Sequence, residues 1–125
     1  MTTEVAVELP LAGRSILVVE DNPIIAMDVV QGLRDAGASV YEARTLSDAL
    51  CKVECRALSA AVLDHALDGD DSSQICDRLD QRNIPFVVYS GYDHVEGPCS
   101  EGEHVRKPVS PPVLVDAVVN LFRKS

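Results

Sequence analysis

Three short apolar runs constrain the fold of this chain more than any other feature. They occupy residues 15–19, 60–64 and 86–90 and consist almost entirely of small and aliphatic side chains. A short run that is apolar on both faces suits a strand buried in a parallel sheet. Two weaker strands are predicted at 39–43 and 103–106, and a helical pattern follows most of the five. The sequence therefore predicts a series of β/α units.

Polar capping residues support the predicted helices. Asn22 precedes Pro23, Thr45 precedes the second helix, and Ser110 precedes two prolines, as expected at helix starts. We predict helices from Pro23 to about Ala36, from 46 to about 56, from 72 or 73 to about 82, and from about 111 to 123. Residues 91–102 contain three glycines and a proline, so at most one or two helical turns fit there.

Alternating strands and helices of this length predict an α/β fold with helices on both faces of a parallel sheet. Right-handed crossovers leave few topologies. The natural choice is a doubly wound sheet of five strands in the order 2-1-3-4-5, with a shortened or missing fourth helix.

Length and charge narrow the class of protein. The 125 residues indicate one domain, which we place at residues 14–125 after an N-terminal lead-in of residues 1–13. A net charge of −9 argues against binding to nucleic acid or to an anionic membrane surface. The start of the chain lacks the pattern of a signal peptide, and no apolar stretch is long enough to span a membrane. We expect a cytoplasmic protein.

Four cysteines are present, at positions 51, 55, 76 and 99, and no Cys-x-x-Cys pair occurs. The three histidines are scattered, so a zinc site lacks nearby ligands. In a reducing cytosol we expect ordinary free thiols rather than a metal site or a disulfide.

Polar side chains stand where the predicted strands end. Glu20 and Asp21 follow the first strand, Asp64 closes the third, Ser90 closes the fourth, and Lys107 follows the fifth. The carboxyl ends of parallel strands meet at one edge of the sheet, so these groups should share a pocket. Clustered carboxylates repel one another, and Mg²⁺ relieves that repulsion while leaving positions open for phosphate. In such a pocket Asp64 could attack phosphorus, with Lys107 and Ser90 contacting phosphoryl oxygens.

These residues, together with Pro108, stand in the order found in the receiver domains of two-component response regulators, which the chain resembles over about residues 14–124. The resemblance implies a flavodoxin-like fold. It also implies that Asp64 accepts a phosphoryl group from a histidine kinase or a histidine phosphotransfer protein in a Mg²⁺-dependent reaction.

The resemblance implies further roles. Asp21 would bind Mg²⁺ directly alongside Asp64, Glu20 would act through water, and the carbonyl of Ala66 would be another ligand. Ser90 would be the switch hydroxyl that turns toward the phosphoryl group, and Lys107 would pair with that group. The bond before Pro108 would be cis.

Four features depart from the usual pattern. Asp68 stands where a Pro is usual, and His104 replaces the usual Tyr or Phe three residues before the Lys. The end of the fourth strand is similar to an alphaproteobacterial subgroup of receivers with the motif Phe-Ala-Thr-Gly and an aromatic close behind, here Tyr92. The stretch from Ser90 to Lys107 is shorter than usual. Either His104 or Tyr92 could take the place of the switch aromatic.

The function predicted on this basis is that of a stand-alone receiver, because no linker or output domain follows residue 125. It would not be an enzyme beyond its own phosphorylation and dephosphorylation, and its output would be protein contacts in a phosphorelay with an unknown downstream partner. The alternative is a pseudo-receiver, an interaction domain that works without phosphate. A haloacid-dehalogenase-like phosphatase would need a second Asp at position 66, and a dinucleotide-binding enzyme would need a Gly-rich turn at 20–23; the sequence has neither.

Overall fold

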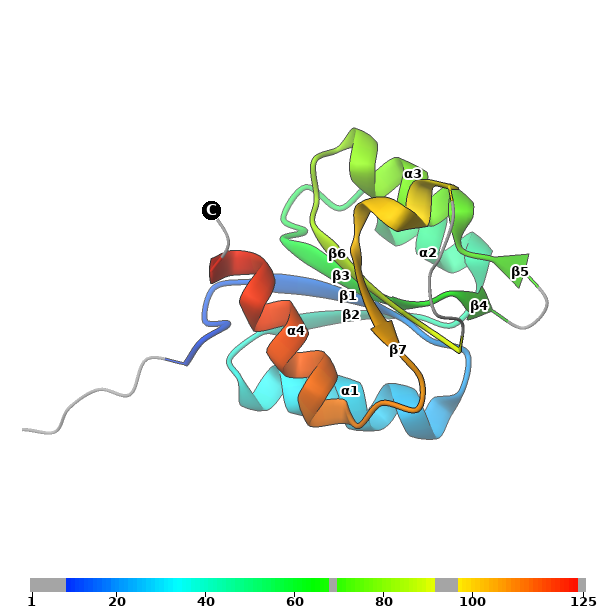
Figure 1. Cartoon of the computed structure of the whole chain (residues 1–125). Helices are drawn as coiled ribbons and strands as arrows, with labels where there is room; N and C mark the ends of the chain where they lie inside the picture. Colours follow the sequence, from blue (N-terminus) through cyan, green and yellow to red (C-terminus); the bar gives the residue numbers. More distant parts are fainter. Residues whose placement is uncertain (1–8, 68–69, 92–96, 124–125) are drawn as a thin grey trace, which may run out of the picture.

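The fold is built around one parallel sheet. The computed structural model describes residues 9–67, 70–91 and 97–123. Its main sheet contains β1 (Ser15–Val19), β2 (Ser39–Ala43), β3 (Ala60–Asp64), β6 (Phe86–Ser90) and β7 (Glu103–Arg106). All neighbouring pairs are parallel and the order is β2-β1-β3-β6-β7. In chain order of these five strands this is 2-1-3-4-5, which confirms the predicted topology (Figure 1).

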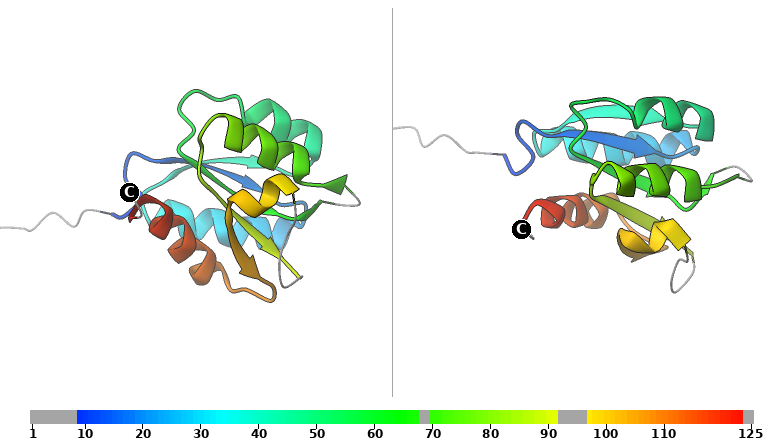
Figure 2. Two further views of the ribbon diagram at one scale, coloured as in Figure 1. Left: turned by 45° about the horizontal axis from the view of Figure 1, so that its top comes forward. Right: turned by 90° about the horizontal axis from the view of Figure 1, so that it is seen from above.

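Two helical layers cover the sheet, one on each face (Figures 1 and 2). The helices α1 (Pro23–Asp35) and α4 (Pro111–Arg123) pack on one face, and α2 (Leu46–Lys52) and α3 (Ser73–Gln81) pack on the other. The side chain of Asn22 accepts hydrogen bonds from the backbone N–H groups of Ile24 and Ile25, and Thr45 caps α2. These caps satisfy N–H groups that a helix start leaves without partners.

The core is aliphatic and lies in two clusters separated by the sheet. Beneath α1 and α4 it includes Val29, Leu33 and Leu114, each at most 1% exposed. Beneath α2 and α3 it includes Ala49 and Leu79, both fully buried. All residues of β3 and β6 are buried, so the central strands are covered on both faces as their apolar sequences predict.

The helix α2 ends earlier than the sequence predicts, at Lys52 rather than near residue 56. The backbone after it tightens, with the N–H of Cys55 bonded to the carbonyl of Lys52. Arg82, just past α3, donates to the carbonyl oxygens of Val53 (2.5 Å) and Cys55 (3.1 Å). The guanidinium of Arg82 therefore satisfies two carbonyl groups that follow the end of α2 and would otherwise lack a partner.

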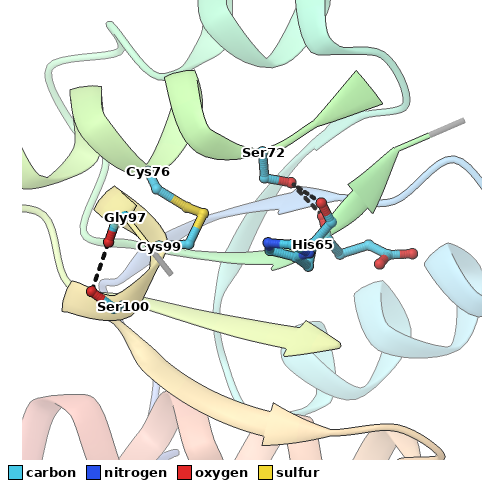
Figure 3. The surroundings of a disulfide bond; sticks show 7 residues. His65, Ser72, Cys76, Gly97, Cys99 and Ser100 are labelled. Atoms are coloured by element: carbon cyan, nitrogen blue, oxygen red, sulfur yellow. Dashed lines mark hydrogen bonds between the residues drawn. A yellow bond between two sulfur atoms is a disulfide. The ribbon is translucent and has the colours of Figure 1, made fainter. Parts of the chain in front are cut away.

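A short 3₁₀ helix, η1 (Gly97–Glu101), stands where the fourth helix of a doubly wound domain of this size is expected. This confirms the shortened fourth helix. The helix η1 packs beside α3, and a disulfide joins Cys76 of α3 to Cys99 of η1 (Figure 3). The expectation of ordinary free thiols is therefore wrong for this pair, which packing brings together across 23 positions of sequence. Cys51 and Cys55 are free.

The end of the lead-in belongs to the packed structure. Leu11 is fully buried beneath α1, and its N–H donates to the carbonyl of Ala36 at 2.8 Å. Residues 1–8 lie outside the described part of the chain, and the boundary between lead-in and receiver stays a prediction. Among the described residues no helix combines the length and the apolar character needed to cross a lipid bilayer.

Candidate phosphorylation and metal site

Three carboxyl groups meet at the carboxyl edge of the sheet. Glu20 and Asp21 directly follow β1, and Asp64 is the last residue of β3, the strand beside it. Each offers one carboxylate oxygen to a group whose members all lie within 4.8 Å of one another. Glu20 is 1% exposed and Asp64 5% exposed, so two of the three acids are buried.

Lys107 supplies the positive charge of the site. It follows β7, and its Nζ lies 2.8 Å from Oδ1 of Asp64. Its backbone N–H donates to the carbonyl of Ser90 at 2.7 Å, which holds the β7 end against the β6 end. The peptide bond from Lys107 to Pro108 is cis, the isomer that the resemblance implies. An ammonium that is only partly exposed beside a buried carboxylate offsets part of the local negative charge.

Two serines, Ser90 and Ser72, belong to the segments next to the end of β3 that carries Asp64. Ser90 ends β6 and is 2% exposed. Ser72 begins the turn into α3, and its hydroxyl donates to the carbonyl oxygens of Asp64 (2.5 Å) and His65 (3.1 Å) (Figure 3). Ser72 stands at the N-cap position, but its hydroxyl makes no cap hydrogen bond. It instead fixes the strand end that carries Asp64.

A short hairpin, whose two strands have two residues each, follows Asp64. The short strand β4 (Ala66–Leu67) pairs antiparallel with β5 (Asp70–Asp71). Ala66 is therefore two residues beyond Asp64 at the start of β4, and its role as a carbonyl ligand stays a prediction. Asp68 lies outside the described residues.

Burial and like charge act together on the acids. Burial raises the pKa of the Glu20 carboxyl above its ordinary value, and the neighbouring acids Asp21 and Asp64 add to the rise. Hydrogen bonds from Tyr89 and from the backbone N–H of Asn22 oppose it. A pocket that keeps a carboxyl group from ionising easily when no cation is bound has the electrostatics of a cation site.

The donor set fits Mg²⁺. Hard divalent cations take oxygen ligands, and Mg²⁺ is usually held by one or two carboxylates together with water and phosphate. Three carboxylates within one small group meet that requirement, and the ammonium of Lys107 contacts one of them, Asp64. Asp21 and Asp64 would hold the ion, with Glu20 beside them.

Tyr89 is a site residue that the sequence interpretation missed. It precedes Ser90 in β6, and its hydroxyl donates to Oε1 of Glu20 at 2.6 Å. Burial, followed by the hydrogen bond to Glu20 and by the charge of that residue, raises the pKa of this phenol well above its ordinary value, so it remains a donor. The available signal was a tyrosine in an otherwise apolar buried strand, because a buried phenol hydroxyl needs a partner.

His104 and Tyr92 are the two candidates for the position of the switch aromatic. His104 lies on β7 opposite Val88, half-buried on the face of the sheet that α2 and α3 cover. Its Nε2 is buried and has no hydrogen-bond partner among the described residues. Tyr92 falls outside the described residues. Both assignments therefore stay predictions.

Sequence comparison agrees with the fold and the pocket. The family model for the response regulator receiver domain matches residues 16–119. The chain belongs to the response regulator receiver family, whose members are signalling domains that are phosphorylated and bind Mg²⁺ at an acidic pocket. A comparison with curated protein sequences found no match.

Solved structures of receivers resemble the chain over most of its length. SdrG from Sphingomonas melonis Fr1 is 32% identical with a TM-score of 0.72, covering 87% of this chain and 96% of that one. A response regulator receiver protein from Sinorhizobium medicae WSM419 is 24% identical, with a TM-score of 0.79 and coverages of 90% and 96%. A CheY-like receiver domain protein from Methanospirillum hungatei JF-1 is 23% identical, with a TM-score of 0.76 and coverages of 89% and 94%. The last two similarities show the fold alone.

Proposed function

We propose that this chain is a phosphoacceptor receiver in which Asp64 takes a phosphoryl group from a phosphohistidine of a histidine kinase or phosphotransfer protein. The observation that carries the proposal is the Asp64 carboxylate itself. It lies in one group with Glu20 and Asp21, and its Oδ1 is 2.8 Å from Nζ of Lys107. A nucleophilic oxygen between a cation site and a lysine ammonium is an arrangement suited to phosphoryl transfer.

In the proposed step, a carboxylate oxygen of Asp64 forms a bond to phosphorus while the phosphorus–nitrogen bond to the donor histidine breaks. The imidazole leaves with the electron pair of that bond. Bound Mg²⁺ supplies charge neutralisation for the phosphoryl oxygens and the acids. Lys107 stands in contact with Asp64 before transfer and would pair with a phosphoryl oxygen after it. The hydroxyl of Ser90, at the end of β6, would turn toward the phosphoryl group as the switch hydroxyl.

Exposed apolar side chains near the pocket support a protein as phosphodonor. Ile24 and Met27, on the first turns of α1, are 72% and 69% exposed. A cleft of about 470 Å³ between α1 and α4 is lined by Ile25, Lys107 and Pro108 among others, so it opens beside the site. Large exposed apolar groups in one place are typical of protein contacts. We infer that output also passes through protein contacts in a phosphorelay.

The test is labelling of the purified chain by acetyl phosphate in Mg²⁺, followed by intact-mass spectrometry. We expect one phosphoryl group on the wild type, none on Asp64→Asn, and none on the wild type in EDTA. Asp77→Asn removes an exposed carboxyl of α3 and serves as the matched control, which should label like the wild type.

A wild type that stays unlabelled by acetyl phosphate and by phosphohistidine donors in Mg²⁺ would refute phosphoacceptance. The remaining function would then be the pseudo-receiver, an interaction domain that does not need phosphate.

A further inference from the structure

Tyr89 contacts both halves of the pocket from a single position. Its side chain is 1% exposed, and its hydroxyl lies 2.6 Å from Oε1 of Glu20. Nζ of Lys107 stands 5.4 Å from the centre of its ring. Its neighbour in the β3–β6 pairing is Asp64. One aromatic residue therefore lies against the acidic side and the lysine side of the same site.

We propose that Tyr89 is a positioning residue of the magnesium site, whose hydroxyl holds the Glu20 carboxylate in place beside Asp21 and Asp64. This inference rests on the proposed function, because it concerns the metal that phosphoryl transfer requires.

The contacts of Glu20 explain how the positioning works. Oε1 accepts from the Tyr89 hydroxyl, and Oε2 accepts from the backbone N–H of Asn22 at 3.1 Å. Glutamate has several rotatable bonds, and two donors from different elements fix the orientation of its carboxylate. With the hydroxyl absent, one donor remains to orient it. A metal would then have to order the side chain as it binds, which lowers affinity.

Removing the hydroxyl should therefore weaken Mg²⁺ binding by about tenfold, the change expected for one hydrogen bond to a charged group. Tyr89→Phe keeps the ring, which packs in the core cluster under α1 and α4 and lies beneath Lys107. The substitution thus removes the contact with Glu20 while preserving the other contacts of the residue.

The experiment measures Mg²⁺ affinity by isothermal titration calorimetry for the wild type, Tyr89→Phe and Tyr41→Phe. Tyr41 lies on β2 at the edge of the sheet and is 38% exposed, so its variant is the matched control for loss of a phenol hydroxyl. Urea unfolding in EDTA gives the stability of each variant separately. We expect the dissociation constant to rise about tenfold in Tyr89→Phe and to stay unchanged in Tyr41→Phe.

A double-mutant cycle with Glu20→Gln tests the route. If Tyr89 acts through the Glu20 carboxylate, its substitution should change Mg²⁺ affinity by less than about twofold once that carboxylate is gone. The full tenfold effect in the Glu20→Gln background would overturn the proposal, because Tyr89 would then act by another route.

Labelling separates this proposal from the function on which it rests. At saturating Mg²⁺, Tyr89→Phe should reach the wild-type extent of labelling by acetyl phosphate. Equal Mg²⁺ affinity of the wild type and Tyr89→Phe overturns the positioning role while the labelled wild type keeps the proposed function. A lower unfolding free energy with unchanged Mg²⁺ affinity also overturns it, since that is a purely structural role. A wild type that binds no Mg²⁺ refutes both.

Discussion

Reduction of the Cys76–Cys99 disulfide should lower the free energy of unfolding by a predictable amount. The bond joins α3 to η1 and closes a loop over a sequence separation of 23. In the chain-entropy description, a link of this span restricts the unfolded chain and raises the free energy of the unfolded state by about 3.4 kcal/mol at 25 °C. Both cysteines are fully buried, so the reduced thiols keep nearly the same packing in the folded state. The covalent link itself is then the main difference between the oxidised and the reduced chain.

The assay is urea unfolding of the oxidised chain and of the chain reduced by a phosphine. With a slope of about 2 kcal/mol per molar urea, the midpoint should fall by roughly 1.7 M. The starting protein carries Cys51→Ala and Cys55→Ala, so that no other thiol can exchange with the pair. In that background, Cys99→Ala is the control, and its midpoint should not respond to the reductant.

Equal unfolding free energies for the oxidised and reduced chains would refute this reasoning. So would alkylation of both Cys76 and Cys99 when the starting protein is purified without reductant and then denatured, because η1 would then be held to α3 by packing alone.

Three further predictions concern single positions. The pKa of Glu20 is raised in the folded state, so the folded state holds this proton more tightly than the unfolded state does. Without metal, the free energy of unfolding should therefore fall as the pH rises from 4.5 through the raised pKa. Glu20→Gln lacks this titration, so its free energy of unfolding should rise relative to that of the wild type over the same pH range, as measured by urea unfolding in EDTA. Arg82→Ala leaves two backbone carbonyls after α2 without their donor and should cost about 1–3 kcal/mol in urea unfolding, whereas an unchanged midpoint would mean that water replaces the guanidinium. A Cβ at Gly102 would meet the Phe86 ring at 2.4 Å, so Gly102→Ala should lower the melting temperature, while alanine at the open position Gly91 should change it much less.

The sheet and the strand-end residues could be predicted because they depend on local patterns. The apolar runs around Val62 and Val88 identify buried strands, and the rule that parallel strands share a carboxyl edge brings Asp64 and Lys107 together. Neither step needs knowledge of which side chains touch. The bounds of the five main strands accordingly match the sequence prediction.

Contacts between distant elements could not be predicted in the same way. The pairing of Cys76 with Cys99 depends on how η1 lies against α3, and the early end of α2 depends on Arg82, which directly follows α3. Tyr89 reads as one more buried strand residue until its partner Glu20, 69 positions earlier, is placed beside it.

The sequence by itself determined the α/β architecture, the strand order and the acids that line one edge of the sheet. These follow from periodicity and chain connectivity, which are properties of neighbouring residues. Only the tertiary structure decided the hydrogen bond from Tyr89 to Glu20 and the tie between η1 and α3. Such contacts form where separate elements pack, and their geometry is set by the whole core rather than by any one segment.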